Sequence, residues 1–174
     1  MTGHNSMKMN DLLQLYIELG FEDAETFIQS GNVIFRTPSE NESATTDKIE
    51  KSIKQRFGYD IRVMIRNIEE LRVIFSSNPF TGEEKFDPAL TAVILLHEIP
   101  SEAQIQKVIN ADYPPDKFKI IGREIFIFCP NGFGRSKIYT NFFENKMGVT
   151  GTARNWKTIT TILNIAEIKT GKSC

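Results

Sequence analysis

The order of the predicted helices and strands in residues 90–153 constrains the fold of this chain more than any other feature. Short apolar runs predict strands, whereas apolar residues three and four positions apart predict helices. In chain order these patterns predict a strand, a helix opened by the capping box of Ser101 and Gln104, a hairpin turning at Gly122-Arg123, a helix ended by Gly148, and an extended segment over 149–153. The order β-α-β-β-α-β is typical of the split βαβ, or ferredoxin-like, unit.

Residues 9–65 repeat this plan without its first strand. The patterns predict a helix ended by Gly20, a hairpin over 26–35, a polar loop over 37–46, a helix ended by Gly58, and a short buried strand over 61–65. The absent strand belongs in the interior of a ferredoxin-like sheet, so its loss would leave inner strand edges unpaired. Either Met1 is not the native start and a strand precedes Gly3, or another segment or chain fills the position.

A connecting helix joins the two patterns. The capping-box spacing of Asn67 and Glu70 opens it, and Asn78-Pro79 ends it. A last amphipathic helix follows residue 153. We therefore predict an α+β protein with two ferredoxin-like (α/β-plait) subdomains, residues 1–80 and 81–174, the second carrying the C-terminal helix.

The composition is that of an ordinary soluble globular protein and offers little material for metal or thiol chemistry. The chain has 174 residues, of which 40% are hydrophobic and 25% charged, with two histidines and two cysteines. The histidines and cysteines are scattered rather than clustered as zinc ligands, and Cys129 and Cys174 make a poor disulfide pair. No signal peptide opens the sequence, and the apolar stretch over 92–96 is too short to span a bilayer. We expect a soluble, cytoplasmic protein with no metal and no cofactor.

The net charge of −1 conceals two regions of opposite sign. Residues 123–174 hold eight basic and three acidic residues, a net of +5, whereas the other 122 residues hold 13 basic and 19 acidic residues, a net of −6. This asymmetry indicates either an anionic partner for the basic part or attraction between the two parts.

The basic part contains a glycine-rich segment over 130–137, Pro-Asn-Gly-Phe-Gly-Arg-Ser-Lys. It leaves a predicted strand and enters a predicted helix, an arrangement in which backbone N–H groups and cationic side chains bind oxyanions. The candidate ligand-binding residues are Gly132, Gly134, Arg135, Ser136 and Lys137. The alternative is an ordinary strand-to-helix connection, with the glycines making the turn and Ser136 as the N-cap.

Two further segments carry candidate residues. Arg154, Asn155 and Trp156 lie together, and a tryptophan beside cations suits stacking on a base or a sugar. Equally, Asn155 suits the N-cap of the last helix, and Trp156 suits packing on the core. At the tip of the first hairpin, turn chemistry accounts for Gly31 and Asn32 but leaves Gln29 as a candidate ligand contact.

These segments resemble the bacterial domain-of-unknown-function family 1697. The resemblance extends over essentially the whole chain and is carried by the run over 26–35 with its Gln-Ser-Gly-Asn, by Asn78-Pro79-Phe80, by Ser136-Lys137, and by the segment over 152–158 with its Arg-Asn-Trp. It implies two ferredoxin-like subdomains and no particular activity. Family members usually begin with a strand and an Arg-Gly-Ile-Asn-Val-Gly-Gly-like loop ahead of a Lys-Met that here is Lys8-Met9, so the resemblance implies that the same first strand is absent.

The function that we predict from the sequence is binding of a phosphate-bearing small molecule or nucleic acid by the candidate residues above. One alternative is an enzyme that acts on a small anionic substrate between the subdomains, with Ser136 or His97 as the reacting group. His97 ends a predicted strand, where a structural histidine is commoner, so we assign no catalytic residue. Another alternative is a structural module that forms a homodimer through a sheet edge. Phe126 and Phe128 share one strand face, which suits either RNA stacking or the core.

Overall fold

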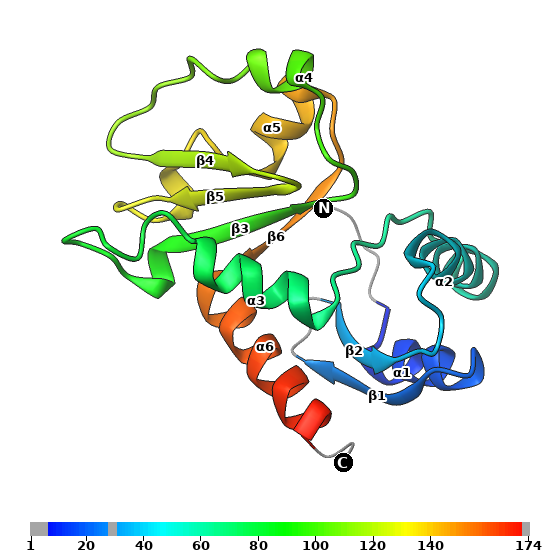
Figure 1. Ribbon diagram of the computed structural model, residues 1–174. Coiled ribbons are helices and arrows are strands. Elements are labelled where there is room, and N and C mark those ends of the chain that lie inside the picture. The colour runs from blue at the N-terminus through cyan, green and yellow to red at the C-terminus, as the bar shows by residue number, and fades with distance from the viewer. Residues whose placement is uncertain (1–6, 28–30, 172–174) are drawn as a thin grey trace. The chain divides into compact units, whose positions relative to one another are not determined.

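Helices and antiparallel strands follow one another along the chain largely as the sequence predicts (Figure 1). The computed structural model describes residues 7–27 and 31–171. The chain divides between Ile65 and Arg66 into unit 1, residues 1–65, and unit 2, residues 66–174. The connecting helix, grouped with the first subdomain in the sequence-based division at residue 80, lies in unit 2 because it packs along the C-terminal helix.

The described residues of unit 1 form two helices and one hairpin. Its elements are α1 (Met9–Glu18), β1 (Glu22–Phe27), β2 (Asn32–Arg36) and α2 (Glu42–Phe57). Gly20, at φ 85°, follows the end of α1 in the left-handed conformation that glycine adopts without strain. The predicted hairpin is confirmed, with Thr26 opposite Val33, although residues 28–30 of its turn lie outside the described part of the chain.

Two predictions in unit 1 are wrong. The polar loop predicted over 37–46 is shorter, because Asn41 caps α2: its Oδ1 accepts a hydrogen bond of 2.9 Å from the Ala44 N–H. Residues 61–65 form no strand, although Ile61, Val63 and Ile65 pack against the core of unit 1 as the apolar pattern predicts. A strand needs a neighbour with which to pair, and β1 is the one strand paired with β2 in the described residues.

Unit 2 contains the whole predicted β-α-β-β-α-β order. Its elements are α3 (Ile68–Ser77), the 3₁₀ turn η1 (Pro88–Leu90), β3 (Thr91–Leu96), α4 (Glu102–Gln106), β4 (Lys117–Ile121), β5 (Glu124–Phe128), the 3₁₀ turn η2 (Phe133–Arg135), α5 (Thr140–Met147), β6 (Gly151–Asn155) and α6 (Trp156–Gly171). Both predicted capping boxes, at Asn67 and at Ser101, are present. The strand order β4-β5-β3-β6, antiparallel throughout, is the ferredoxin-like order.

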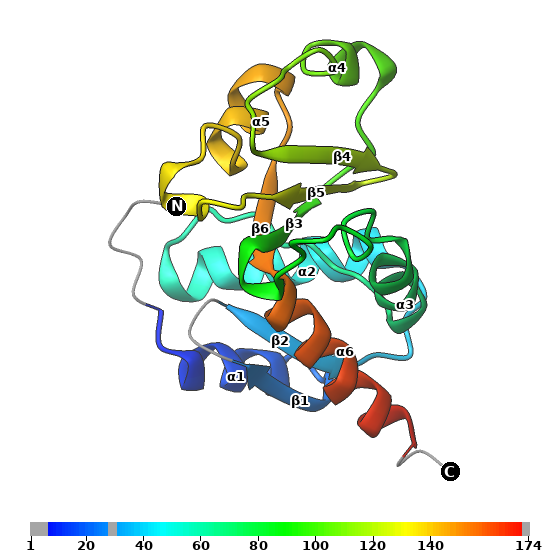
Figure 2. The ribbon, with the colours of Figure 1, turned by 90° about the vertical axis from the view of Figure 1, so that its left-hand side faces the viewer.

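The central strand β3 is buried along its whole length and separates two apolar layers. Ile94 and Leu96 face the α4 and α5 side, where they pack with Ile125, Ile127 and Phe143. The opposite face contacts α6, and α3 lies side by side with α6 (Figure 1). Helix α6 continues directly from the edge strand β6 (Figure 2), so the end of β6 sets where that helix begins. In the described part of the chain, no helix has the length and apolar character needed to cross a membrane.

Candidate functional site

The basic loop, residues 130–137, connects β5 to α5 in unit 2 and is held by its own backbone. Gly132 has φ 85°, and its N–H donates to the Cys129 carbonyl at 2.9 Å. The Ser136 N–H donates to the Phe133 carbonyl at 3.1 Å, closing the short turn η2. The Phe133 ring packs against Tyr139, with 5.3 Å between centroids. These contacts fix the backbone of the basic loop, and the other side chains of the loop project from this backbone.

The sequence-based interpretation of this segment as the direct entrance to a helix is wrong. Helix α5 begins at Thr140, and Ser136 is not its N-cap. The Ser136 Oγ instead accepts a hydrogen bond of 3.1 Å from the Ile138 N–H, which turns the chain before the helix. A three-residue 3₁₀ turn offers no helix terminus to an anion, so any capacity of this loop to bind an anion rests on its cationic side chains.

Two such side chains, Arg135 and Lys137, are exposed on the basic loop. Within residues 7–27 and 31–171, neither cation has an ion pair or hydrogen bond through its side chain. Ser136 between them is extended, with φ −75° and ψ 140°, and side chains two positions apart on an extended chain project to the same side. The two cations are therefore available together to an anion.

Arg154, on the edge strand β6, has a partly buried side chain. Its Nη1 donates to Thr152 Oγ1 at 2.6 Å and to the Ala153 carbonyl at 2.8 Å. Burial lowers the pKa of its guanidinium, and the interaction with Tyr139 opposes that change. An arginine pKa starts so high that the group stays charged, so Arg154 places a positive charge beside Tyr139.

Tyr139 connects Arg154 to the basic loop, and sequence reasoning did not identify it. Burial raises the pKa of its phenol, while the positive charge of Arg154 lowers it and Cys129 raises it. Cys129, fully buried, interacts in turn with the Ser136 hydroxyl and with Asp116. Tyr139 and Cys129, which carry no sequence motif, thus interact electrostatically with Arg154 and with Ser136, respectively.

The thiol of Cys129 is not a reactive nucleophile. Burial raises its pKa to about 11, and the hydrogen bond with Ser136 only partly opposes this shift. Because the thiolate is the reactive form, the buried thiol acts as a packing residue at neutral pH.

For Asn155 and Trp156 the structural alternatives hold. The Asn155 Oδ1 accepts a hydrogen bond of 2.8 Å from the Thr158 N–H and so caps α6. Trp156 is 5% exposed and stacks on Phe75, with 5.7 Å between ring centroids and 12° between planes. Its ring faces a neighbouring side chain rather than a ligand. Gln29, the remaining candidate, lies outside the described residues.

The aromatic residues of the sheet also belong to the core. Phe126 and Phe128 share a face, as predicted, and both are buried. Phe80 stacks over Phe128, with 5.9 Å between centroids. An RNA-binding plait stacks bases on exposed aromatics at these positions, and here both rings are covered.

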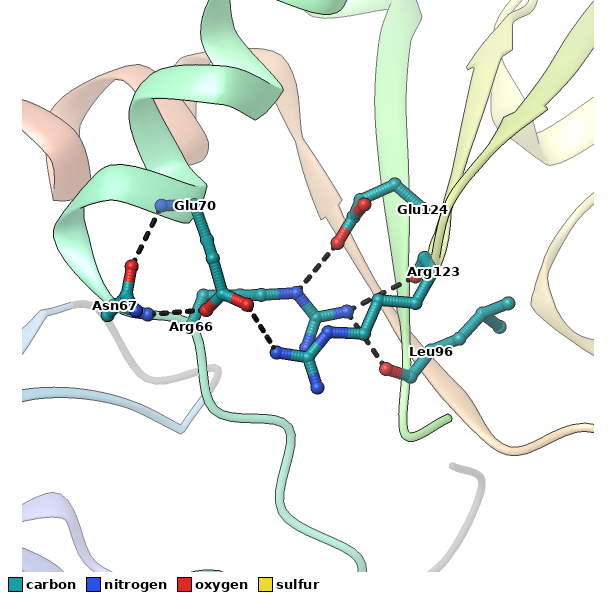
Figure 3. Close-up of polar contacts among 6 residues, drawn as sticks. All are labelled: Arg66, Asn67, Glu70, Leu96, Arg123 and Glu124. Carbon is teal, nitrogen blue, oxygen red and sulfur yellow. Dashed lines mark hydrogen bonds and ion pairs between the residues drawn. The ribbon is translucent and has the colours of Figure 1, made fainter. Parts of the chain in front are cut away.

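A second polar cluster, which the sequence does not indicate, lies where α3 meets the sheet (Figure 3). Arg66 forms a buried ion pair with Glu124 and donates through Nη2 to the carbonyls of Leu96 and Arg123, at 2.9 and 3.2 Å. The Arg123 guanidinium donates to Glu70 at 2.8 Å. Internal partners surround both arginines, so this cluster stabilises the fold and offers no vacant charge to a ligand.

Across residues 7–27 and 31–171, no three side chains of His, Cys, Asp or Glu are grouped as metal ligands. His97 follows β3, and its Nδ1 lies 3.8 Å from Oε1 of Glu98, whose side chain is highly exposed.

Comparison with known proteins supports the family and the fold. A family model described as "Protein of unknown function (DUF1697)" matches residues 1–126. No curated protein matches the chain in sequence. Among solved structures, the chain is similar to the conserved bacterial protein SP0830 from Streptococcus pneumoniae, with a TM-score of 0.71 and 18% identity over 95% of this chain and 92% of that chain. This similarity confirms the arrangement of helices and strands and indicates no particular activity.

Proposed function

The chain belongs to the DUF1697 family of proteins of unknown function, and we propose that it binds a phosphate-bearing ligand through the basic loop of unit 2. The observation that carries the proposal is the pair of exposed cations, Arg135 and Lys137, on a loop whose base is fixed by Gly132 and Phe133. A fixed loop loses little conformational freedom when it binds.

The chemistry of the two side chains favours phosphate over other anions. The guanidinium of arginine matches two phosphate oxygens with parallel donors, and the lysine ammonium adds a compact charge. The positively charged Arg154, beside Tyr139 at the end of the loop, adds to the local potential. The surrounding region, residues 123–174, carries a net charge of +5, because it contains eight basic and three acidic residues.

The burial of the aromatic residues favours contact with the phosphate groups of a ligand over contact with its bases. Phe126, Phe128 and Trp156 are all buried, so none is offered to a base. Contacts to phosphate alone carry no direct sequence readout, and the affinity is then salt-dependent. The proposed ligand is therefore recognised by its phosphate groups, whether it is a nucleotide or a nucleic-acid strand.

The test measures fluorescence anisotropy of a labelled single-stranded RNA, with inorganic phosphate and a nucleoside triphosphate as competitors. With two cationic contacts, we expect the logarithm of affinity to fall against that of salt concentration with a slope of about −1 to −2. Replacing Arg135 and Lys137 with alanine should weaken binding at least tenfold. Competition by the triphosphate but not by an uncharged nucleoside would identify phosphate as the recognised group.

A charge-matched control separates a site from general electrostatic attraction. Lys107 and Lys119 are also exposed cations of unit 2, outside the basic loop. Their double alanine variant changes the net charge equally and should bind with nearly unchanged affinity. Equal losses in both double variants, or binding that does not depend on salt, would contradict the proposal.

A further inference from the structure

Strand β6 is one edge of the sheet of unit 2, and its backbone groups point alternately toward β3 and away from it. The His97 N–H, at the end of β3, donates to the Thr150 carbonyl at 2.9 Å. These two residues continue the register in which Leu96 is opposite Gly151, so they form a hydrogen-bonded pair. Such pairs recur at every second residue of an antiparallel ladder, so the backbone groups of Gly151 and Ala153 face outward.

Two of these outward backbone groups are hydrogen-bonded to charged side chains. The Gly151 N–H donates to Oε1 of Glu144, on α5, at 3.2 Å. The Ala153 carbonyl accepts a hydrogen bond of 2.8 Å from Nη1 of Arg154, and the same Nη1 donates to Thr152 Oγ1 at 2.6 Å. The carboxylate oxygen and the guanidinium nitrogen therefore lie where an added strand would place its own carbonyl and its own N–H.

A second copy of this chain is the strand donor that these two contacts oppose most directly. Two β6 edges related by a two-fold axis at Thr152 would pair Gly151 with Ala153 of the second copy. In that register the Gly151 N–H of each copy would donate to the Ala153 carbonyl of the other. Glu144 and Arg154 already hold both groups of that hydrogen bond, so pairing would displace a carboxylate and a guanidinium from their partners.

The other edge of the sheet, β4, has a different feature that opposes pairing. Lys117 and Lys119 alternate along it and are exposed, and lysines on an edge strand disfavour the addition of another strand. Two β4 edges related by a two-fold axis at Lys119 would place this residue directly opposite its own copy, and like charges in that position are destabilising. The sequence of β6, Gly-Thr-Ala-Arg-Asn, has no lysine, so its edge depends on the contacts of Glu144 and Arg154.

We infer that Glu144 and Arg154 close the β6 edge of unit 2 to strand pairing with a second copy of this chain. The homodimer through a sheet edge, one of the alternatives open from the sequence, therefore does not form through β6. Arg154 has a role here that is separate from any ligand, since its Nη1 holds a backbone carbonyl of its own strand. The inference concerns the chain without ligand and is independent of the phosphate site on the basic loop.

The test removes both side chains from the full chain, in the double variant Glu144→Ala/Arg154→Ala. Glu102 and Lys107 are exposed residues of opposite charge in and beside α4, and their double alanine variant is the charge-matched control. Light scattering at increasing protein concentration measures self-association. Amide hydrogen exchange followed by NMR, at the same concentrations, measures protection of β6 and of β4 separately, and circular dichroism establishes that each variant is folded.

We expect the double variant to self-associate, with exchange at the Ala153 amide slowing about tenfold between the lowest and the highest concentration. The wild-type chain and the charge-matched control should show no concentration-dependent protection of β6.

Single variants test the inference even where the double variant does not fold. Glu144→Ala should self-associate through β6 more weakly than the double variant, whereas Glu144→Gln keeps an oxygen acceptor for the Gly151 N–H and should behave as the wild type. Four results would overturn the inference: folded alanine variants that show no association, protection of β4 instead of β6, association of the charge-matched control to the same extent, or concentration-dependent protection of β6 in the wild-type chain.

Discussion

Arg66 and Glu124, 58 residues apart in the sequence, form an ion pair of 2.7 Å between Nε and Oε1 inside unit 2. Only 3% of the Arg66 side chain is exposed. Burial lowers the pKa of Arg66, and the hydrogen bond and charge of Glu124 oppose that shift. Through the carbonyls of Leu96 and Arg123, the same guanidinium joins the start of α3 to the end of β3 and to the β4–β5 turn (Figure 3).

Replacing Glu124 with glutamine should destabilise unit 2 strongly. The substitution keeps the side-chain shape but leaves the buried Arg66 charge without its carboxylate, which costs about 3 kcal/mol or more. Urea denaturation followed by circular dichroism measures the change in the free energy of unfolding.

The exposed pair between Arg72 and Glu167, 2.6 Å apart, provides the control for this prediction. Its charges remain solvated when a partner is removed, so Glu167→Gln should have a much smaller effect than Glu124→Gln. Similar losses in the two variants would show that burial of Arg66 does not determine the strength of its ion pair.

Gly151→Ala should destabilise unit 2 by about 1–3 kcal/mol, because an added methyl overpacks the sheet. A Cβ at this position would lie 2.7 Å from Ile94 Cγ2 and 3.1 Å from the Leu95 carbonyl oxygen. Thermal denaturation gives the comparison with Gly134→Ala. A Cβ at Gly134 meets nothing within 4 Å, and its φ is not positive, so that variant should keep the wild-type Tm. A loss of Tm in Gly134→Ala as large as in Gly151→Ala would contradict this account.

Local features of the fold were predictable from the sequence, and contacts between distant residues were not. The glycine that follows α1, the capping box of Asn67 and the turn at Gly122 are confirmed, because each depends on a few neighbouring residues. The alternative with Ser136 as the N-cap of α5 was wrong, because Ser136 hydrogen-bonds to Ile138 and the helix begins later, at Thr140. Apolar periodicity reports which side of a segment is buried, but a ladder also needs a neighbour, and this is why residues 61–65 were wrongly predicted to form a strand.

The same distinction between local features and contacts of distant residues applies to the candidate site. The sequence identified the cations Arg135, Lys137 and Arg154, since glycine spacing and charge are visible in a short segment. It did not identify Tyr139, which interacts with Arg154 only because β6 returns to the sheet beside β3. Because β6 leads directly into α6, Trp156 at the start of α6 packs against Phe75. The sequence alone did not decide between ligand stacking and core packing for this tryptophan.

Asn155→Ala should lower stability by about 1 kcal/mol through loss of the N-cap of α6, whereas Asn155→Asp should retain the cap. The aspartate also adds a negative charge one residue from Arg154. Chemical denaturation and anisotropy on the same variants therefore separate capping from ligand binding. A stability loss in Asn155→Asp equal to that in Asn155→Ala would contradict the capping role.

Stability should fall as pH rises from about 9 to about 11, in part because of Cys129. Burial raises the pKa of this thiol to about 11 from an ordinary value of 9.0, so the folded state holds the proton more tightly than the unfolded state. The resulting stabilisation is complete below pH 9 and is lost as pH passes 11. Burial also raises the pKa of Tyr16 and of Tyr139, which act in the same direction. Thermal denaturation at several pH values should show a shallower alkaline fall in Cys129→Ala, and an unchanged slope would exclude a contribution from the thiol.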